Sequence, residues 1–343
     1  MHILQLLTFV GVKLRIFFFL LSIGIFWVAQ AQVLPPLGKQ RAGTSGMQFL
    51  KIPVDPRSAG MGESFIAVAN DASSLYWNPA GMTIADSQRI HLQGAYTRYF
   101  ADITMNYGAG FIKLKNEHCI GVSVTHLNSG EMDVTTEFQP FGTGQKFTAT
   151  NTAIGLSYAK KLTDNFSFGV TSKYANESIF GLRTNTLLFD LGFQYDIGYK
   201  NLRFAVTMTN FGFNVKPKGE LEVIKLTGTQ TVNSFEQVTV PSMFKVGFAW
   251  DAIKNDNHLF TLSGQLNHPT DNKETFNVGA EYSWNRLLYF RTGYQIGADE
   301  SHIPSFGFGL KFTQRFGALR IDYAFTNKER LGFTHKFGVG VSF

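Results

Sequence analysis

The chain has 343 residues, and its 31 Lys and Arg outnumber its 25 Asp and Glu to give a formal net charge of +6. A surplus this small, spread along the chain, excludes the concentrated basic surface of a nucleic-acid-binding protein. The 34 Phe and 34 Gly are unusual for a soluble domain, whereas a mean hydropathy of −0.03 excludes a helical membrane protein. Strands that cross a bilayer satisfy both observations, because only every other residue in them must be apolar.

Residues 1–31 have the three parts of a secretory signal peptide. Lys13 and Arg15 precede the apolar run 16–28, and small residues follow at 29–31, where a peptidase cleaves. The apolar run is shorter than the roughly 18 residues that a spanning helix needs. We therefore expect export, with a mature chain that starts at Gln32.

Residues 32–88 come before any strand pattern and form a separate region. Between 58 and 82 this region is too rich in small residues for a membrane strand. Gly60 and Gly62 allow close backbone packing, and Asp71 brings a charge. We expect an N-terminal extension that ends in a hatch inside the lumen of the barrel formed by residues 89–343.

From residue 89 onward, apolar and polar residues alternate with the period of two that is typical of strands with one apolar face. The run 187–197 is one example, with Leu187 and Phe189 on one face and Asp190 on the other. About fourteen such strands are expected, and they start near Ile90, Ile103, Cys119, Phe147, Asn165, Thr184, Leu202, Ser242, His258, Thr275, Leu287, Ser305, Ala318 and Gly332.

The connections distinguish a barrel from a soluble sandwich, which alternates in the same way. Links after even-numbered strands are tight, whereas most links after odd-numbered strands are longer, as periplasmic turns and extracellular loops are in an outer-membrane barrel. The longer links are 129–146, 176–183, 214–239, 267–274 and 297–304. The sequence thus predicts an all-β protein of the cell outer membrane: a transmembrane antiparallel β-barrel of about fourteen strands whose last strand, ending at Phe343, pairs with the first.

Charged residues fall on the face of these strands that points into the lumen. Two interpretations remain open: the charges pair with one another and with hatch residues such as Asp71, or they form a wetted channel wall. The predicted lumen charges are Lys173, Asp190, Arg203, Lys245, Glu281, Arg320 and Asp322.

Several short motifs resemble the PorV/PorQ family, which lies within the wider FadL-type (OMPP1/FadL/TodX) barrels. They are FLKI at 49–52, RSAGMG at 57–62, AVAND at 67–71, WNPAG at 77–81 and RIDYAF at 320–325. In FadL-type barrels the Asn-Pro-Ala tripeptide belongs to the hatch, so the resemblance gives that role to Asn78, Pro79 and Ala80.

The resemblance implies two functions. PorV-like proteins serve the type IX secretion system and receive the carboxy-terminal signal domains of exported cargo, whereas FadL-like proteins take up lipophilic molecules. For the first function, apolar anchors in the long links are expected at Phe138, Phe141, Phe147 and Phe235, although such loops also occur as surface caps without a partner. Outer-membrane lipid is an expected partner in both cases. The first function adds secretion components or the signal domains of cargo, and the second adds a lipophilic ligand or detergent. We expect no nucleic acid, and we expect the barrel to be monomeric.

Signatures of catalysis are missing from the sequence. The histidines are scattered, and the chain contains no HExxH or GxSxG motif and no carboxylate cluster at ligand spacing. We expect no catalytic residue, no metal and no cofactor.

Overall fold

The computed structural model describes residues 43–225, 228–298 and 303–343. The predicted signal peptide and the first part of the N-terminal extension, up to residue 42, lie outside the described residues.

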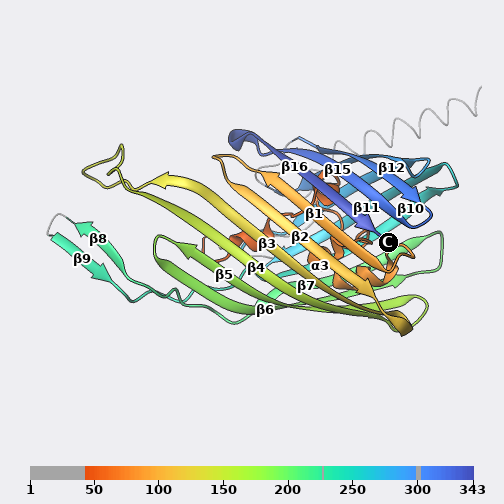
Figure 1. Cartoon of the computed structure of the whole chain (residues 1–343), viewed down its shortest axis with the longest axis horizontal. Helices are drawn as coiled ribbons and strands as arrows, with labels where there is room; N and C mark the ends of the chain where they lie inside the picture. The colour runs from red at the N-terminus through yellow and green to blue at the C-terminus, as the bar shows by residue number, and fades with distance from the viewer. Residues whose placement is uncertain (1–42, 226–227, 299–302) are drawn as a thin grey trace, which may run out of the picture. The chain divides into compact units, whose positions relative to one another are not determined.

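Fourteen antiparallel strands close into a barrel in which each strand pairs with its neighbours and β16 pairs with β1 (Figure 1). This confirms the predicted fold, and every predicted strand start lies within two residues of the observed one. The strands of the barrel are β1 (Ile90–Arg98), β2 (Thr104–Lys113), β3 (His118–Asp133), β4 (Lys146–Lys161), β5 (Phe166–Ile179), β6 (Leu182–Asp196), β7 (Leu202–Gly212), β10 (Met243–Lys254), β11 (His258–Pro269), β12 (Thr275–Trp284), β13 (Leu288–Ile296), β14 (Ser305–Gln314), β15 (Gly317–Asn327) and β16 (Phe333–Ser342).

Closure of the barrel depends on the pairing of β1 with β16. The register runs from His91 opposite Ser342 to Arg98 opposite His335. This pairing removes the row of unpaired N–H and C=O groups that an open sheet edge would expose to lipid.

The alternation of the sequence places apolar side chains outside the barrel and polar ones inside. In β6 the outward Phe189 is 38% exposed, whereas the inward Asp190 is fully buried. A strand needs about 9–11 residues to cross a bilayer. With 16 residues each, β3 and β4 are long enough to continue past the lipid.

The two ends of the barrel differ in their connections. At the end called here the turn end, links are short, and one of them is the 3-10 turn η3 (Lys115–Glu117). The other end, called the loop end, carries the longer links, including the one that contains η4 (Glu329–Leu331).

Two of the predicted long links differ from expectation. The prediction of a long link at 176–183 is wrong, because β5 and β6 continue to a two-residue turn at Phe180 and Gly181, with φ of 47° and 82°. These strands pass beyond the lipid, so their last residues lose the apolar alternation by which a strand is recognised. The link at 214–239 contains a small hairpin of β8 (Leu221–Lys225) and β9 (Gly228–Val232), which Figure 1 shows beyond the loop end.

Residues 47–85, called here the N-terminal segment, are folded into short helical turns and are mostly buried. The turns are η1 (Gln48–Lys51), α2 (Pro56–Gly60), α3 (Ser74–Trp77) and η2 (Pro79–Ile84). Helix α2 begins where the Asp55 carboxylate accepts the Ser58 N–H at 3.0 Å, with Pro56 at the first helical position. None of the helices among the described residues has the length and apolar character needed to cross a membrane.

Contacts with strands on different sides of the barrel place the N-terminal segment within the wall. Lys336 of β16 donates to the Pro53 carbonyl at 2.7 Å, and the Gln265 side chain of β11 accepts from the Phe65 N–H at 2.9 Å. On the β6 side, Asn78 donates to the Phe193 carbonyl at 3.2 Å.

Candidate functional site in the lumen

Two chambers lie inside the barrel, one toward each end. Each has a volume of about 370 Å³, and they share no lining residue. The turn-end chamber is lined by side chains such as Asp86 and Lys311, and the loop-end chamber by Lys51, Trp77 and Lys245.

An apolar layer of the N-terminal segment, called here the septum, lies between the chambers and consists of Met61, Phe65, Ile66 and Trp77. All four side chains are at most 2% exposed, and the Phe65 and Trp77 rings meet edge to face with centroids 6.0 Å apart. These side chains belong to one buried cluster with wall alanines of β7 and β10.

Cations border the septum on both sides. The Arg57 guanidinium lies 5.0 Å from the Phe65 ring centroid and lines the turn-end chamber. The Lys245 ammonium lies 4.7 Å from the Trp77 ring centroid and lines the loop-end chamber. The order Arg57, Phe65, Trp77, Lys245 therefore runs from one chamber to the other.

Arg57 joins the N-terminal segment to the wall through two acids. Its Nε and Nη2 each donate to a Glu281 carboxylate oxygen at 3.0 Å, the two-pronged geometry that suits a guanidinium and a carboxylate. Its Nη1 lies 3.0 Å from Asp71 Oδ2. Arg57 and Glu281 are both buried, so the pair is shielded from water.

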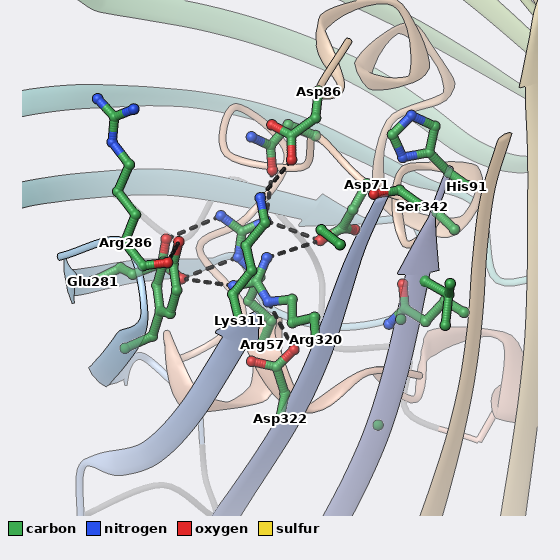
Figure 2. Close-up of a pocket in the computed structure, with 18 of the residues that line it drawn as sticks. Arg57, Asp71, Asp86, His91, Glu281, Arg286, Lys311, Arg320, Asp322 and Ser342 are labelled. Atoms are coloured by element: carbon green, nitrogen blue, oxygen red, sulfur yellow. Dashed lines mark hydrogen bonds and ion pairs between the residues drawn. The ribbon is translucent and has the colours of Figure 1, made fainter. Parts of the chain in front are cut away.

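Further wall residues extend these pairs into a continuous network on β12, β13 and β15. Figure 2 shows five of its members: Arg57, Asp71, Glu281, Arg320 and Asp322. Arg291 bridges two acids, since its Nε lies 2.6 Å from Glu281 Oε2 and its Nη1 lies 2.7 Å from Asp322 Oδ1. Arg320 lies 3.4 Å from Asp71 and 2.9 Å from Asp322. The ion-pair network consists of Arg57, Asp71, Glu281, Arg291, Arg320 and Asp322.

The network sets the charge state of Asp71. Burial alone would raise the pKa of this carboxyl, but the guanidiniums of Arg57 and Arg320 outweigh that effect, and the pKa falls to about 2. By contrast, burial raises the pKa of Asp55, whose carboxylate accepts hydrogen bonds from Ser58 and, at 2.7 Å, from Trp77 Nε1.

The Asn-Pro-Ala tripeptide forms a bend against the wall. Asn78 Oδ1 accepts the Ala80 N–H at 3.1 Å, and Asn78 Nδ2 donates to the Ile66 carbonyl at 3.0 Å. Pro79 begins η2. A Cβ on Gly169 of β5 would lie 2.5 Å from the Pro79 carbonyl carbon, so only glycine lets the wall approach this bend. That these residues act as a hatch stays a prediction.

The predicted lumen charges outside the network have different environments. Lys173 pairs with Asp190 at 2.7 Å, and Arg203 pairs with Asp251 at 2.8 Å. Lys245 is 7% exposed, and neither an ion pair nor a hydrogen bond joins its Nζ to another described residue. The two predicted hatch glycines, Gly60 and Gly62, lie against β13 and β14, whereas Asn78 and Pro79 lie against β5 and β6.

The predicted loop anchors divide into two groups. Phe138 and Phe141 are 59% and 100% exposed. Phe147 instead packs on Phe180 with ring centroids 5.4 Å apart, and Phe235 is half-buried. The role of these residues in docking stays a prediction.

Three residues that belong to these sites were not among those predicted from the sequence. Arg291 follows the outward Phe290 in β13 and therefore faces inward, so the alternation along this strand could have revealed it. Arg57 could not have been found by parity because it lies on a helical turn. Phe213, 85% exposed, follows β7 directly and resembles a strand residue in sequence.

No group of three or more His, Cys, Asp or Glu side chains in the described ranges is placed to hold a metal ion. The septum packs against the strands of the wall, and ion pairs hold the N-terminal segment to that wall.

A family model described as Type IX secretion system protein PorV matches residues 36–190. No curated protein gives a significant match. The resemblance indicated by the N-terminal motifs is thereby confirmed over that range.

Solved structures of two toluene transporters and of a FadL homologue have the same fold. The toluene transporter TbuX of Ralstonia pickettii has a TM-score of 0.58 at 12% identity, covering 84% of this chain and 96% of that chain. The toluene transporter TodX of Pseudomonas putida has a TM-score of 0.53 at 11% identity, with coverages of 89% and 99%. A FadL homologue of Pseudomonas aeruginosa has a TM-score of 0.52 at 11% identity, with coverages of 85% and 98%. At these identities the likeness shows the fold alone.

Proposed function

Because the chain belongs to the PorV family over residues 36–190 and forms a FadL-type barrel of the outer membrane, we propose that it is a non-enzymatic accessory of type IX protein secretion. It engages exported cargo or the secretion channel through the loop end of a single barrel.

The family match carries this proposal, and the loop end supports it. The strands β3 and β4 continue past the length needed to cross lipid, and the β8–β9 hairpin lies beyond the same end (Figure 1). Phe138, Phe141 and Phe213 expose 59%, 100% and 85% of their surface there. Large apolar side chains that are exposed outside the lipid are typical of surfaces that bind another protein.

The divided lumen supports the same proposal. The septum fills the space between the chambers, and on the side of the turn end the ion-pair network joins the N-terminal segment to the wall. A barrel whose role is docking needs no free passage, so this arrangement suits a receptor better than an open channel.

Site-specific cross-linking tests the proposal. A photo-reactive amino acid at Phe141 should give adducts with exported proteins or secretion components in cells, because this side chain is fully exposed at the loop end. The matched control is the same amino acid at Phe248, which is also exposed but lies on the lipid-facing side of β10. If adducts are missing at Phe141 or occur equally at both positions, the proposal is wrong.

Uptake of lipophilic molecules is the second candidate, and the fold shared with toluene transporters favours it. The septum would then have to move, and the ligand would have to pass the charged turn-end chamber. Cells that lack the gene would take up lipophilic compounds of several chain lengths more slowly. Unchanged uptake of all of them would exclude this role.

A further inference from the structure

Lys245 is a buried lumen charge that has no ion pair with another described residue. It lies on β10, is 93% buried, and its ammonium group borders the loop-end chamber above the Trp77 ring. The neighbouring lumen lysine, Lys173, has an ion pair with Asp190 at 2.7 Å, whereas Lys245 has none with a described residue. The carboxylates of Glu63 and Asp190 act on this ammonium group through space without an ion pair. A buried charge without an ion pair is costly, so such a group is expected to meet a counter-charge when the protein functions.

The loop-end chamber carries a surplus of positive charge. Besides Lys245, its described lining includes Lys51, Lys273 and Lys328, and Glu63 is the one acidic residue in that lining. Lys51 is held by Asp271 at 3.0 Å, which neutralises one cation. Without Lys273, the cations Lys245 and Lys328 still outnumber the one acid, Glu63, in the described lining, and this surplus favours an anion because a cleft with an excess of one sign of charge concentrates counter-ions.

The lining also indicates what the rest of the ligand looks like. Alongside the lysines, several amide side chains border the chamber and offer both donors and acceptors of hydrogen bonds. They are Gln265, Asn267, Asn272 and Gln295. Gln265 and Asn267 are already bonded within the protein, because Gln265 Oε1 accepts the Phe65 N–H, Gln265 Nε2 donates to Asn267 Oδ1, and Asn267 Nδ2 donates to Thr275. Asn272 Nδ2 and the Gln295 amide remain for a ligand, and hydroxyl groups would satisfy them whereas a hydrocarbon chain would not.

We propose that the loop-end chamber binds a small hydroxylated organic anion whose carboxylate or phosphate group pairs with Lys245. The chamber volume of about 370 Å³ lies within the range of roughly 300–1,000 Å³ that is usual for small-molecule sites. The inference does not depend on the proposed role in secretion, since it uses only the chamber and its lining.

Calorimetric titration of the purified full-length barrel in detergent tests this site. D-Glucuronate and D-glucose 6-phosphate serve as carboxylate and phosphate probes, D-glucose as the uncharged control and octanoate as the apolar carboxylate. At least one charged sugar should bind tenfold or more tightly than glucose and octanoate. The charged sugar that binds more tightly shows whether the site prefers a carboxylate or a phosphate group.

Variants locate the binding. Lys245→Met should weaken the binding of that probe at least tenfold, and Lys245→Arg should retain part of it because the charge remains. The matched control is Lys254→Met, which removes an exposed lysine bordering the turn-end chamber and should leave the affinity unchanged. Folding of each variant is checked by the mobility shift between boiled and unboiled samples.

Three results would overturn the inference. These are the failure of both charged sugars to bind at millimolar concentration, an affinity that does not change in folded Lys245→Met, and binding of octanoate or glucose that equals or exceeds that of the charged sugars. If Lys245→Met does not fold, the comparison of the four probes on the unaltered protein still decides between these outcomes.

Discussion

Arg57 is the residue through which the N-terminal segment and the wall depend on each other. It pairs with Asp71 of the same segment and with Glu281 of β12, at 3.0 Å in each case. Its substitution leaves both carboxylates with fewer partners, although Arg291 and Arg320 still lie near them. Buried charge networks are sensitive to the loss of one member, because the charge left behind is poorly solvated.

Arg57→Met should therefore lower the free energy of unfolding, toward the lower end of the about 3–5 kcal/mol that is typical when one partner of a buried pair is removed. Urea titration of the refolded barrel in detergent measures this change. The control is Arg98→Met, whose side chain is 68% exposed and lies 3.9 Å from an exposed Asp102. If both variants are as stable as the unaltered protein, the network does not stabilise the fold.

The lowered pKa of Asp71 predicts a dependence of stability on pH. Because the pKa is about 2 in the folded protein and near 3.8 in the unfolded chain, the folded state binds fewer protons between these values. The stabilisation by Asp71 is thus complete above about pH 4 and is lost as the pH falls toward 2. Unfolding measured from pH 6 to pH 2 should show a difference between the unaltered protein and Asp71→Asn that shrinks in this window. A constant difference would contradict the assignment.

Which side chains face the lumen could be predicted from the sequence, but their partners could not. Parity along a strand fixes the face, so the inward positions of Asp190 and Lys245 follow from the alternation. Pairing also depends on how strands shift against one another and on where the N-terminal segment folds. The link between Arg57 and Glu281 spans 224 residues and leaves no mark in the local pattern.

At the scale of the elements, β5 and the bend at Asn78, Pro79 and Ala80 depend on each other because they pack closely together. The wall passes the bend so closely that a side chain at Gly169 would overlap the backbone of Pro79 and Ala80. The bend itself is held by Asn78, which contacts both Ile66 and Phe193.

Gly169→Val should destabilise the barrel by at least the about 1–3 kcal/mol typical of overpacking, because backbone rather than a flexible side chain stands in the way. The matched control is Gly94→Val on β1, where nothing lies within 4 Å of the added Cβ. Both variants are compared by urea unfolding and by heat-modifiable mobility. Equal stability of the two would show that the bend does not lie against β5.

Strand positions were predictable because each crossing of the lipid repeats the same alternation. The turn between β5 and β6 was missed for the same reason, since Asn176 to Ser178 lie where no lipid demands apolar residues. The β8–β9 hairpin was missed because its two strands have five residues each and pair only with each other.

At the scale of the whole molecule, a closed wall surrounds a lumen divided into two chambers, and the loop end carries the exposed side chains of Phe138, Phe141 and Phe213. The even number of strands and the closure of the barrel follow from the sequence. The division of the lumen does not, because it depends on how the turns of the N-terminal segment stack Phe65 on Trp77.

A complementation experiment tests the central claim most directly. Cells that lack the gene receive either the unaltered protein or a variant in which the connection 213–239 is replaced by a short Gly-Ser linker and Phe138 and Phe141 by Ser, changes that leave the barrel strands and the septum intact. The amount of exported type IX cargo and the rate of uptake of a lipophilic compound are then measured in both strains. A role in secretion predicts that the variant loses export while uptake is unaffected. Normal export with the variant, or a loss of uptake without a loss of export, would contradict it.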